Sequence, residues 1–279
     1  MAVSAGTAPV VAERSSLVPR TLSALVLAPI AVGAILLNWP AFDLLVAAGS
    51  GVLAWEWDRL CGEGRFGRTG AALLGVVLAT VLAASLAHAG LACAMALAGA
   101  VLVDGLAMAQ GSPNPRWRGA GALYVGLPAI ALLWLRDEPD GGKILLWLFI
   151  VVWATDIGAY AAGRLIGGPR LAPRWSPHKT WAGLGGGIAS AAVAGAAVAR
   201  GLASADAGGL TALSAGLAVV AQLGDLTESA IKRHFKVKDA SGLIPGHGGL
   251  LDRVDGLLAA APAVALVRLL WGGGVLAWR

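Results

Sequence analysis

The sequence predicts an all-α integral membrane protein with about nine transmembrane helices and a cytoplasmic N-terminus. Of its 279 residues, 57% are hydrophobic and only 13% are charged, whereas soluble domains have about 25% charged and about 45–50% apolar residues. Nine apolar segments come close to the roughly 20 residues that a helix needs to cross a bilayer. Few stretches alternate between polar and apolar residues, so strands are not expected, and continuous apolar runs in lipid favour helices over a barrel.

The apolar segments divide the chain into a tail and two transmembrane parts. Residues 1–20 are small and polar, and we interpret them as a cytoplasmic tail. No small-residue cleavage site stands out, so we expect the first apolar segment to be a retained span and not a cleaved signal peptide. A transmembrane scaffold is expected at 21–137, and a catalytic transmembrane region with a cytoplasm-facing polar site at 138–279. The expected spans are 21–37, 40–55, 69–87, 90–108, 118–135, 143–161, 182–203, 208–227 and 255–272.

The distribution of basic residues supports this topology. With the N-terminus in the cytoplasm, sixteen of the 21 basic residues fall in tails and loops on the cytoplasmic side. Such an excess is typical of cytoplasmic loops, so the net charge of +5 is attributed to orientation and nucleic acid is not an expected partner. The pair of spans between 69 and 108 is the weakest part, because their connection is short and Asp104 lies within the second span.

Glycine and cysteine content adds little about function. Forty glycines allow close approach of membrane helices, and the small-residue faces GLGGG and GAGALYVG are compatible with a homodimer or with packing inside one chain. Cys61 and Cys93 fall in different segments without metal-type spacing, and we interpret them as inert.

Ionisable residues gather where the eighth expected span leaves the membrane. Asp225 lies at membrane depth, where a carboxylate is a functional candidate by default. Asp225, Ser229 and Lys232 are spaced to share one helix face. Snorkelling of basic residues at a helix end explains Lys232 and its neighbours equally well, but it does not explain Asp225, and a role for Glu228 stays open.

A glycine-rich loop and an acidic helix start follow. Glycines around Pro245 prevent regular helix, and Gly248 and Gly249 can expose backbone N–H groups to anions. A flexible loop without function is the alternative. His247 could be a base, a metal ligand or a hydrogen-bonding group. A ninth helix starting near 250–252 would carry Asp252 and Asp255 in its first turns, where the helix dipole alone also favours acidic residues.

A third polar group lies between the sixth and seventh spans. Asp156, Tyr160 and Arg164 recur every fourth residue on one helix face. Ser176, His178, Lys179 and Thr180 come just before the seventh span, and hydroxyls with a lysine near a helix N-terminus suit an anion. Asp156, Asp225 and Asp252, from three spans, should meet at the cytoplasmic end. Because Mg²⁺ commonly bridges one or two carboxylates to phosphates, these residues predict metal-dependent handling of phosphates at a membrane surface.

Residues 229–255, SAIKRHFKVKDASGLIPGHGGLLDRVD, resemble the signature of the phosphatidate cytidylyltransferase family. QLGDLTES and DIGAYAAGRLIGG also look like this family, as do RTLSALVLAPIAV and WEWDRL near the N-terminus. The signature is Ser-x-apolar-Lys-Arg, Lys-Asp, Pro-x-His-Gly-Gly and Asp-Arg-x-Asp. The matching positions are Ser229, Lys232, Arg233, Lys238, Asp239, Pro245, His247, Gly248, Gly249, Asp252, Arg253 and Asp255.

One segment departs from the family pattern. Where the family usually has Ser-Pro-Lys-Lys-Thr-Trp-Glu-Gly, this chain has Ser-Pro-His-Lys-Thr-Trp-Ala-Gly at 176–183. His178 keeps a hydrogen-bond donor, but Ala182 cannot replace a carboxylate, so any role of that glutamate is in doubt here. The metal aspartates and the main signature are unchanged, and activity is still expected.

The resemblance implies transfer of a cytidylyl group from CTP to phosphatidate for phospholipid biosynthesis, in a bacterial cytoplasmic membrane. It implies that Asp225 and Asp252 bind Mg²⁺, with Asp156 and Asp255 as second choices, and that K⁺ accompanies the Mg²⁺. Lys179, Lys232, Arg233 and Arg253 would hold phosphates. The other residues expected to bind substrate are Ser176, Thr180, Ser229, Lys238, His247, Gly248 and Gly249. CTP, phosphatidate and membrane lipids are the expected partners, with a homodimer as a further possibility.

Three other functions share some of these features. A related enzyme could transfer the cytidylyl group to another phosphorylated lipid, such as an ether lipid or polyprenyl phosphate. The Asp-Gly-x₂-Ala-Arg motif of CDP-alcohol phosphotransferases is absent from this sequence. A cation transporter could use Asp104, Asp156 and Asp225 inside spans, but transporters often show related halves, and the halves of this chain do not resemble each other.

Overall fold

The computed structural model describes residues 14–201, 206–243 and 248–271, with nine helices and one two-stranded hairpin in these ranges. All nine segments expected to be helical are helices, and most ends differ from the expected ones by only a few residues. Helix α1 begins within the expected N-terminal tail. The helices are α1 (Arg14–Leu37), α2 (Ala41–Cys61), α3 (Arg68–Ser85), α4 (Ala89–Ala109), α5 (Pro115–Asp137), α6 (Gly141–Leu165), α7 (Trp181–Gly201), α8 (Ala207–His234) and α9 (Leu251–Trp271).

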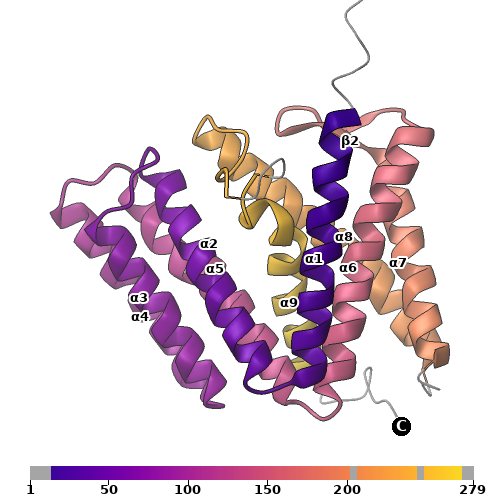
Figure 1. Ribbon diagram of the computed structural model, residues 1–279, viewed down its shortest axis with the longest axis horizontal. Coiled ribbons are helices and arrows are strands. Elements are labelled where there is room, and N and C mark those ends of the chain that lie inside the picture. The colour runs from indigo at the N-terminus through magenta and orange to yellow at the C-terminus, as the bar shows by residue number, and fades with distance from the viewer. Residues whose placement is uncertain (1–13, 202–205, 244–247, 272–279) are drawn as a thin grey trace, which may run out of the picture.

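The helices form two groups joined by α9 (Figure 1). In the first group, α2 to α5 pack against one another, and in the second group α7 packs between α6 and α8. Helix α9 contacts α5, α6 and α8, while α1 contacts α2 and α6. The two groups therefore meet mainly along α9, whose first turns carry the acidic end of the signature, and α5 also contacts α6 directly.

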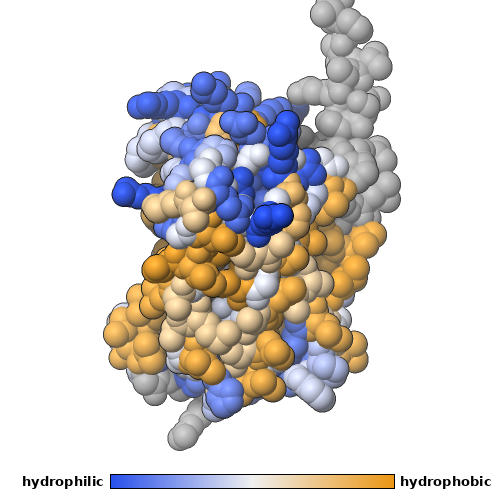
Figure 2. All heavy atoms as spheres, turned by 90° about the vertical axis from the view of Figure 1, so that its left-hand side faces the viewer, coloured by the Kyte–Doolittle hydropathy of each residue, from blue (hydrophilic) through white to orange (hydrophobic). Residues whose placement is uncertain are grey.

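Seven helices in the described part of the chain, α3 to α9, are long and apolar enough to cross a membrane. Helix α2 is less apolar because it carries Asp43, Glu56, Asp58 and Arg59. In Figure 2, apolar residues form a band across the middle of the visible face, and hydrophilic residues cover the upper end of the molecule. The two-stranded hairpin lies at the same end in Figure 1. The protein is therefore an integral membrane protein with one large polar end.

Buried ion pairs account for several ionisable residues in the first group. Arg118 contacts both Asp58 and Thr69, and Arg136 contacts Asp43 at the opposite end of α2. The Asp104 carboxylate, which made its span uncertain from sequence, accepts a hydrogen bond from the Gly119 N–H at 3.0 Å. Asp104 therefore ties α4 to α5, which removes one observation that favoured a transporter.

The small-residue faces pack inside the chain. A Cβ on Gly186 of GLGGG would lie 2.2 Å from the Ala162 Cβ, and a Cβ on Gly121 of GAGALYVG would lie 2.4 Å from the Trp57 ring. Glycine at these positions lets α7 approach α6, and α5 approach α2. These two faces therefore no longer support a homodimer.

The expectation that strands are absent is wrong for one short segment. Strands β1 (Arg170–Ala172) and β2 (Ser176–Thr180) form an antiparallel hairpin between α6 and α7, with Arg170 opposite Thr180. The hairpin lies at the polar end of the molecule (Figure 1). There its backbone polar groups do not have to be satisfied inside lipid, which explains how a strand pair fits this fold.

Candidate active site

Lys232 joins the two parts of the family-like signature. Its ammonium Nζ lies 2.5 Å from Asp252 Oδ1 on α9 and 2.6 Å from Glu228 Oε2 one turn earlier on α8. Glu228 is 1% exposed, and its Oε1 has no hydrogen-bond partner in the described part of the chain. The largely buried Lys232 ammonium thus pairs with two carboxylates, and the Glu228 carboxylate can still accept a hydrogen bond at Oε1.

Asp252 also holds the glycine-rich loop. Its Oδ2 accepts hydrogen bonds from the N–H groups of Gly249, at 2.7 Å, and Ala240, at 3.0 Å. Gly248 has a φ of +79°, which an L side chain rarely adopts, and a Cβ there would lie 2.6 Å from Asp252 Oδ2. Both glycines were predicted to allow backbone approach to phosphate, and in the structure they allow approach to carboxylates.

Glu56 of α2 supports the same loop and was not singled out from the sequence. Its carboxylate accepts hydrogen bonds from the N–H groups of Leu250, at 2.9 Å, and Leu251, at 2.7 Å, and from the Ser241 hydroxyl, at 2.6 Å. Glu56 is fully buried, and it satisfies N–H groups that the start of α9 would otherwise leave free. The first half of the chain is therefore more than scaffold. A carboxylate at the polar end of an apolar run was the available signal.

A second carboxylate cluster lies around Asp225. Its Oδ2 is 2.5 Å from Lys179 Nζ on β2, and its Oδ1 lies 3.5 Å from the Ser229 hydroxyl, at the limit of a hydrogen bond. Asp225 also interacts electrostatically with Asp156 of α6 and Asp255 of α9. The structure thus brings Asp225 near the two aspartates that were second choices.

The remaining predicted site residues lie at several separate places, and some of them stabilise helix ends. Arg253 interacts electrostatically with Asp156. Arg233 Nη1 donates to the Val237 carbonyl oxygen at 3.1 Å, which ties the end of α8. The Thr180 hydroxyl accepts the Gly183 N–H at 3.0 Å and so caps the start of α7. Ser176 and Ala182 are half-buried, Lys238 and His178 are exposed, and His247 lies outside the described residues.

An apolar cavity of about 290 Å³ lies between α5, α8 and α9 and reaches the second cluster. Leu123, Leu127, Leu223 and Leu258 contribute to its walls, and Asp255 supplies a carboxylate. All three helices are apolar enough to cross a membrane. An apolar cavity with a charged group at its edge suits a molecule that has both an apolar and a polar part.

Comparison with known proteins identifies the family. The model of the cytidylyltransferase family matches residues 18–271. The chain belongs to this family. A protein named phosphatidate cytidylyltransferase from Brucella suis is 39% identical over 90% of this chain and 93% of its own length. A protein of the same name from Pseudomonas aeruginosa is 42% identical over 91% of this chain and 97% of its own length.

The donor groups of this cytidylyltransferase determine which metal ions it can bind. No group of three or more His, Cys, Asp or Glu side chains in the described residues forms a ready cation site. Mg²⁺ does not require one, because it is commonly bound by one or two carboxylates together with substrate phosphates. Asp225 pairs with Lys179 and Asp252 pairs with Lys232, and among the described residues Glu228 Oε1 has no hydrogen-bond partner. The donors fit a hard cation that arrives with phosphates.

Proposed function

We propose that this cytidylyltransferase transfers a cytidylyl group from CTP to phosphatidate, forming CDP-diacylglycerol and pyrophosphate for phospholipid biosynthesis. The observation that carries the proposal is the pairing of Lys232 with Asp252 at 2.5 Å across α8 and α9, inside the signature of the family. The similarity to relatives named phosphatidate cytidylyltransferase extends over nearly the whole chain, so the substrate assignment does not rest on one motif.

The reaction needs no nucleophile from the protein. An oxygen of the phosphatidate phosphate forms a bond with the α-phosphorus of CTP, the bond from that phosphorus to the bridging oxygen breaks, and pyrophosphate leaves with the electron pair. The protein must position two anions and offset their charge. Lys179 lies beside Asp225 and Lys232 lies beside Asp252, and each ammonium group would move from its carboxylate to a substrate phosphate. Arg233 follows Lys232 in the sequence, and Arg253 follows Asp252.

Mg²⁺ is the cofactor in this proposal, and Asp225 and Asp252 would hold it, with Asp156 and Asp255 as second choices. A bound Mg²⁺ would neutralise charge on the phosphates. The donor set supports this choice because it consists of carboxylates, which hard cations prefer. K⁺ as a companion ion is carried over from the family resemblance alone.

The active site would face the cytoplasm of a bacterium, at its inner membrane. The excess of basic residues in the tails and loops that the expected topology places on the cytoplasmic side supports this orientation. CTP would arrive from the cytoplasm, and phosphatidate would arrive from the membrane with an acyl chain in the apolar cavity beside Asp255. A homodimer stays a prediction from family resemblance.

The proposal is tested with purified protein, CTP, phosphatidate and Mg²⁺, by following CDP-diacylglycerol with mass spectrometry. Asp225→Asn and Asp252→Asn should each lose turnover while still inserting in the membrane. Asp140→Asn is a matched control, because Asp140 is an exposed residue paired with Lys143 at 2.7 Å on the opposite end of the bundle. If both site variants kept the rate of the control, the metal assignment would be wrong.

The same assay decides between substrates. A panel of phosphatidate, ether-lipid phosphate and polyprenyl phosphate should give the highest kcat/KM with phosphatidate. A higher value for another lipid would replace phosphatidate as the substrate and leave the nucleotide chemistry intact. Flux of Na⁺ or K⁺ through liposomes without CTP turnover would instead favour a transporter.

A further inference from the structure

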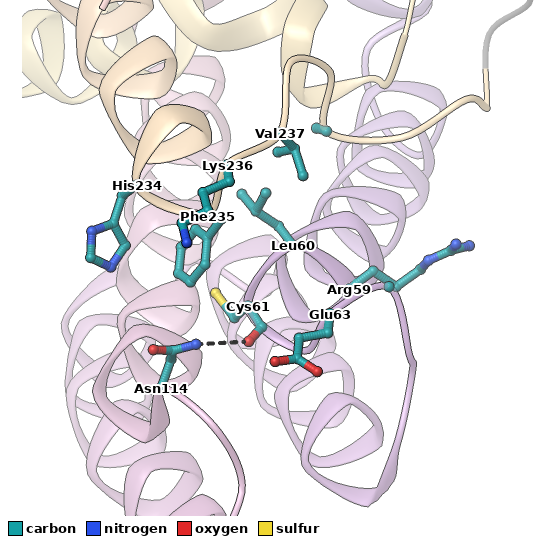
Figure 3. A pocket seen from close by; sticks show the side chains of 11 residues that line it. Arg59, Leu60, Cys61, Glu63, Asn114, His234, Phe235, Lys236 and Val237 are labelled. Carbon is teal, nitrogen blue, oxygen red and sulfur yellow. Dashed lines mark hydrogen bonds between the residues drawn. The ribbon is translucent and has the colours of Figure 1, made fainter.

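A second cavity lies at the polar end of the bundle (Figure 3), and its lining includes none of the carboxylates of the two clusters. Its volume is about 440 Å³, within the range of roughly 300–1,000 Å³ that is usual for small-molecule sites. The walls come from the end of α2, the residue before α5 and the segment that follows α8. The helices of both groups thus contribute to one pocket.

One wall offers hydrogen-bonding groups to a planar ligand. Asn114 Nδ2 donates to the Cys61 carbonyl oxygen at 3.4 Å, and Glu63 lines the same pocket (Figure 3). Asn114 has a left-handed backbone and its side chain does not cap α5, so besides the bond to Cys61 its amide keeps a second N–H and an oxygen for a ligand. The wall combines an amide, which donates and accepts, with a carboxylate and a carbonyl, which only accept.

An aromatic ring forms another part of the pocket. Phe235 is held edge-on by Trp117, with ring centroids 5.5 Å apart, and by His234, with centroids 4.9 Å apart. Leu60 and Val237 add apolar surface beside it. A fixed aromatic ring next to hydrogen-bonding groups is the usual arrangement for holding a nucleobase, which stacks on the ring and is recognised at its edge.

The pocket shares a wall with the Lys232–Asp252 pair. Ala240 lines the pocket, and its N–H donates to Asp252 Oδ2 at 3.0 Å. Val237 also lines the pocket, and its N–H donates to the Lys232 carbonyl oxygen at 3.0 Å. A ligand bound there could therefore extend across residues 237–240 to the proposed phosphate site. Lys236 also lines the pocket and suits a ligand with a negative charge, whereas the Arg59 guanidinium lies over the Trp55 ring, 4.7 Å from its centroid.

We propose that this pocket binds the cytosine base of CTP, an assignment that rests on the proposed function. The base stacks on Phe235, and its exocyclic amine donates to the Glu63 carboxylate. The Asn114 amide donates to an acceptor on the ring. Uracil has a carbonyl oxygen where cytosine has the amine, so Glu63 would face an acceptor and select against UTP. Glu63 is then the residue that determines nucleotide specificity.

Kinetics with CTP and UTP test the assignment through Glu63→Gln and Phe235→Leu. Glu63→Gln should reduce the CTP-over-UTP preference by about tenfold, since a hydrogen bond to a charged group is worth roughly that factor. Phe235→Leu should raise the KM for both nucleotides. The KM for phosphatidate should stay unchanged in both variants, and the Asp140→Asn control should match the wild type. Unchanged nucleotide preference and KM in both variants would overturn the proposal.

Ultraviolet cross-linking of CTP to the full-length protein provides a measurement that does not depend on turnover. The label should map to peptides covering residues 59–64 or 234–240, and label found only elsewhere would overturn the pocket assignment. If CTP labels these peptides but the protein makes no CDP-diacylglycerol, the proposed reaction fails while the base-binding pocket stands. The two proposals can thus fail separately.

Discussion

The Lys232 ammonium contacts the Asp252 carboxylate at 2.5 Å, although the two residues belong to different helices. The side chains of both are largely buried, at 12% and 6% exposure. The contact brings the end of α8 and the start of α9 together at the glycine-rich loop. Any change at this pair should therefore affect the geometry of the loop as well as the charge of the site.

Lys232→Met tests the role of this pair. The substitution removes the cation and leaves Asp252 and Glu228 without their partner. Breaking a largely buried ion pair by removing one member costs about 3–5 kcal/mol, so we expect loss of activity by at least about a hundredfold and a lower thermal midpoint. Lys143→Met removes an ion pair with about half of the lysine side chain exposed and should change neither measurement. Near-normal kcat/KM in Lys232→Met would show that the pair is dispensable.

Glu56→Gln tests whether α2 positions the loop. The amide group of glutamine has only one accepting oxygen, so at least one of the three donors to the Glu56 carboxylate loses its partner. We expect kcat to fall by about tenfold or more, because a lost hydrogen bond to a charged group is worth about 1.5–3 kcal/mol. The KM for phosphatidate should change little if Glu56 acts through the loop.

Asp43→Asn is the matched control for Glu56→Gln. Asp43 is also a buried carboxylate of α2, but it pairs with Arg136 and Ser85 at the far end of the helix. It should lower the thermal midpoint and leave kcat of the folded protein unchanged. Equal losses of kcat and stability in both variants would mean that Glu56 has only a structural role.

Gly249→Ala tests the close approach of the loop to α2. An added Cβ would lie 2.4 Å from Glu56 Oε1, so the Glu56 carboxylate, which holds the loop, or the loop itself must shift. Overpacking of this kind costs about 1–3 kcal/mol, and we expect activity to fall by about tenfold or more. Gly242→Ala in the same connection is the control, because its Cβ would meet nothing within 4 Å. A neutral effect of Gly249→Ala on kcat would indicate a loop that tolerates displacement.

The sequence was sufficient to predict the helices, the polar end and the residues that gather there. The apolar runs are as long as membrane-spanning helices require. Asp225 and Lys232 are noticeable because they are ionisable residues within or next to such a run. The partners of these residues were not predictable. Asp252 was expected to share a metal with Asp225, and in the structure its carboxylate accepts hydrogen bonds from Lys232 and two backbone N–H groups. Glu56 was missed because only the three-dimensional packing brings α2 to a loop nearly two hundred residues later.

Asp255→Asn distinguishes a catalytic carboxylate from a structural one. Asp255 interacts electrostatically with Asp225 and Asp156, and the three neighbouring carboxylates repel one another, with Lys179, 2.5 Å from Asp225, as a compensating charge. The substitution removes one negative charge, so we expect a higher thermal midpoint in the presence of a chelator and a smaller increase of that midpoint on adding Mg²⁺. Turnover should fall at the same time if Asp255 contributes to the Mg²⁺ site. Thermal unfolding with and without Mg²⁺, beside the CTP assay, measures both effects. A lower midpoint under chelation would instead show that Asp255 stabilises α9, where its Oδ1 accepts the Gly256 N–H at 2.7 Å.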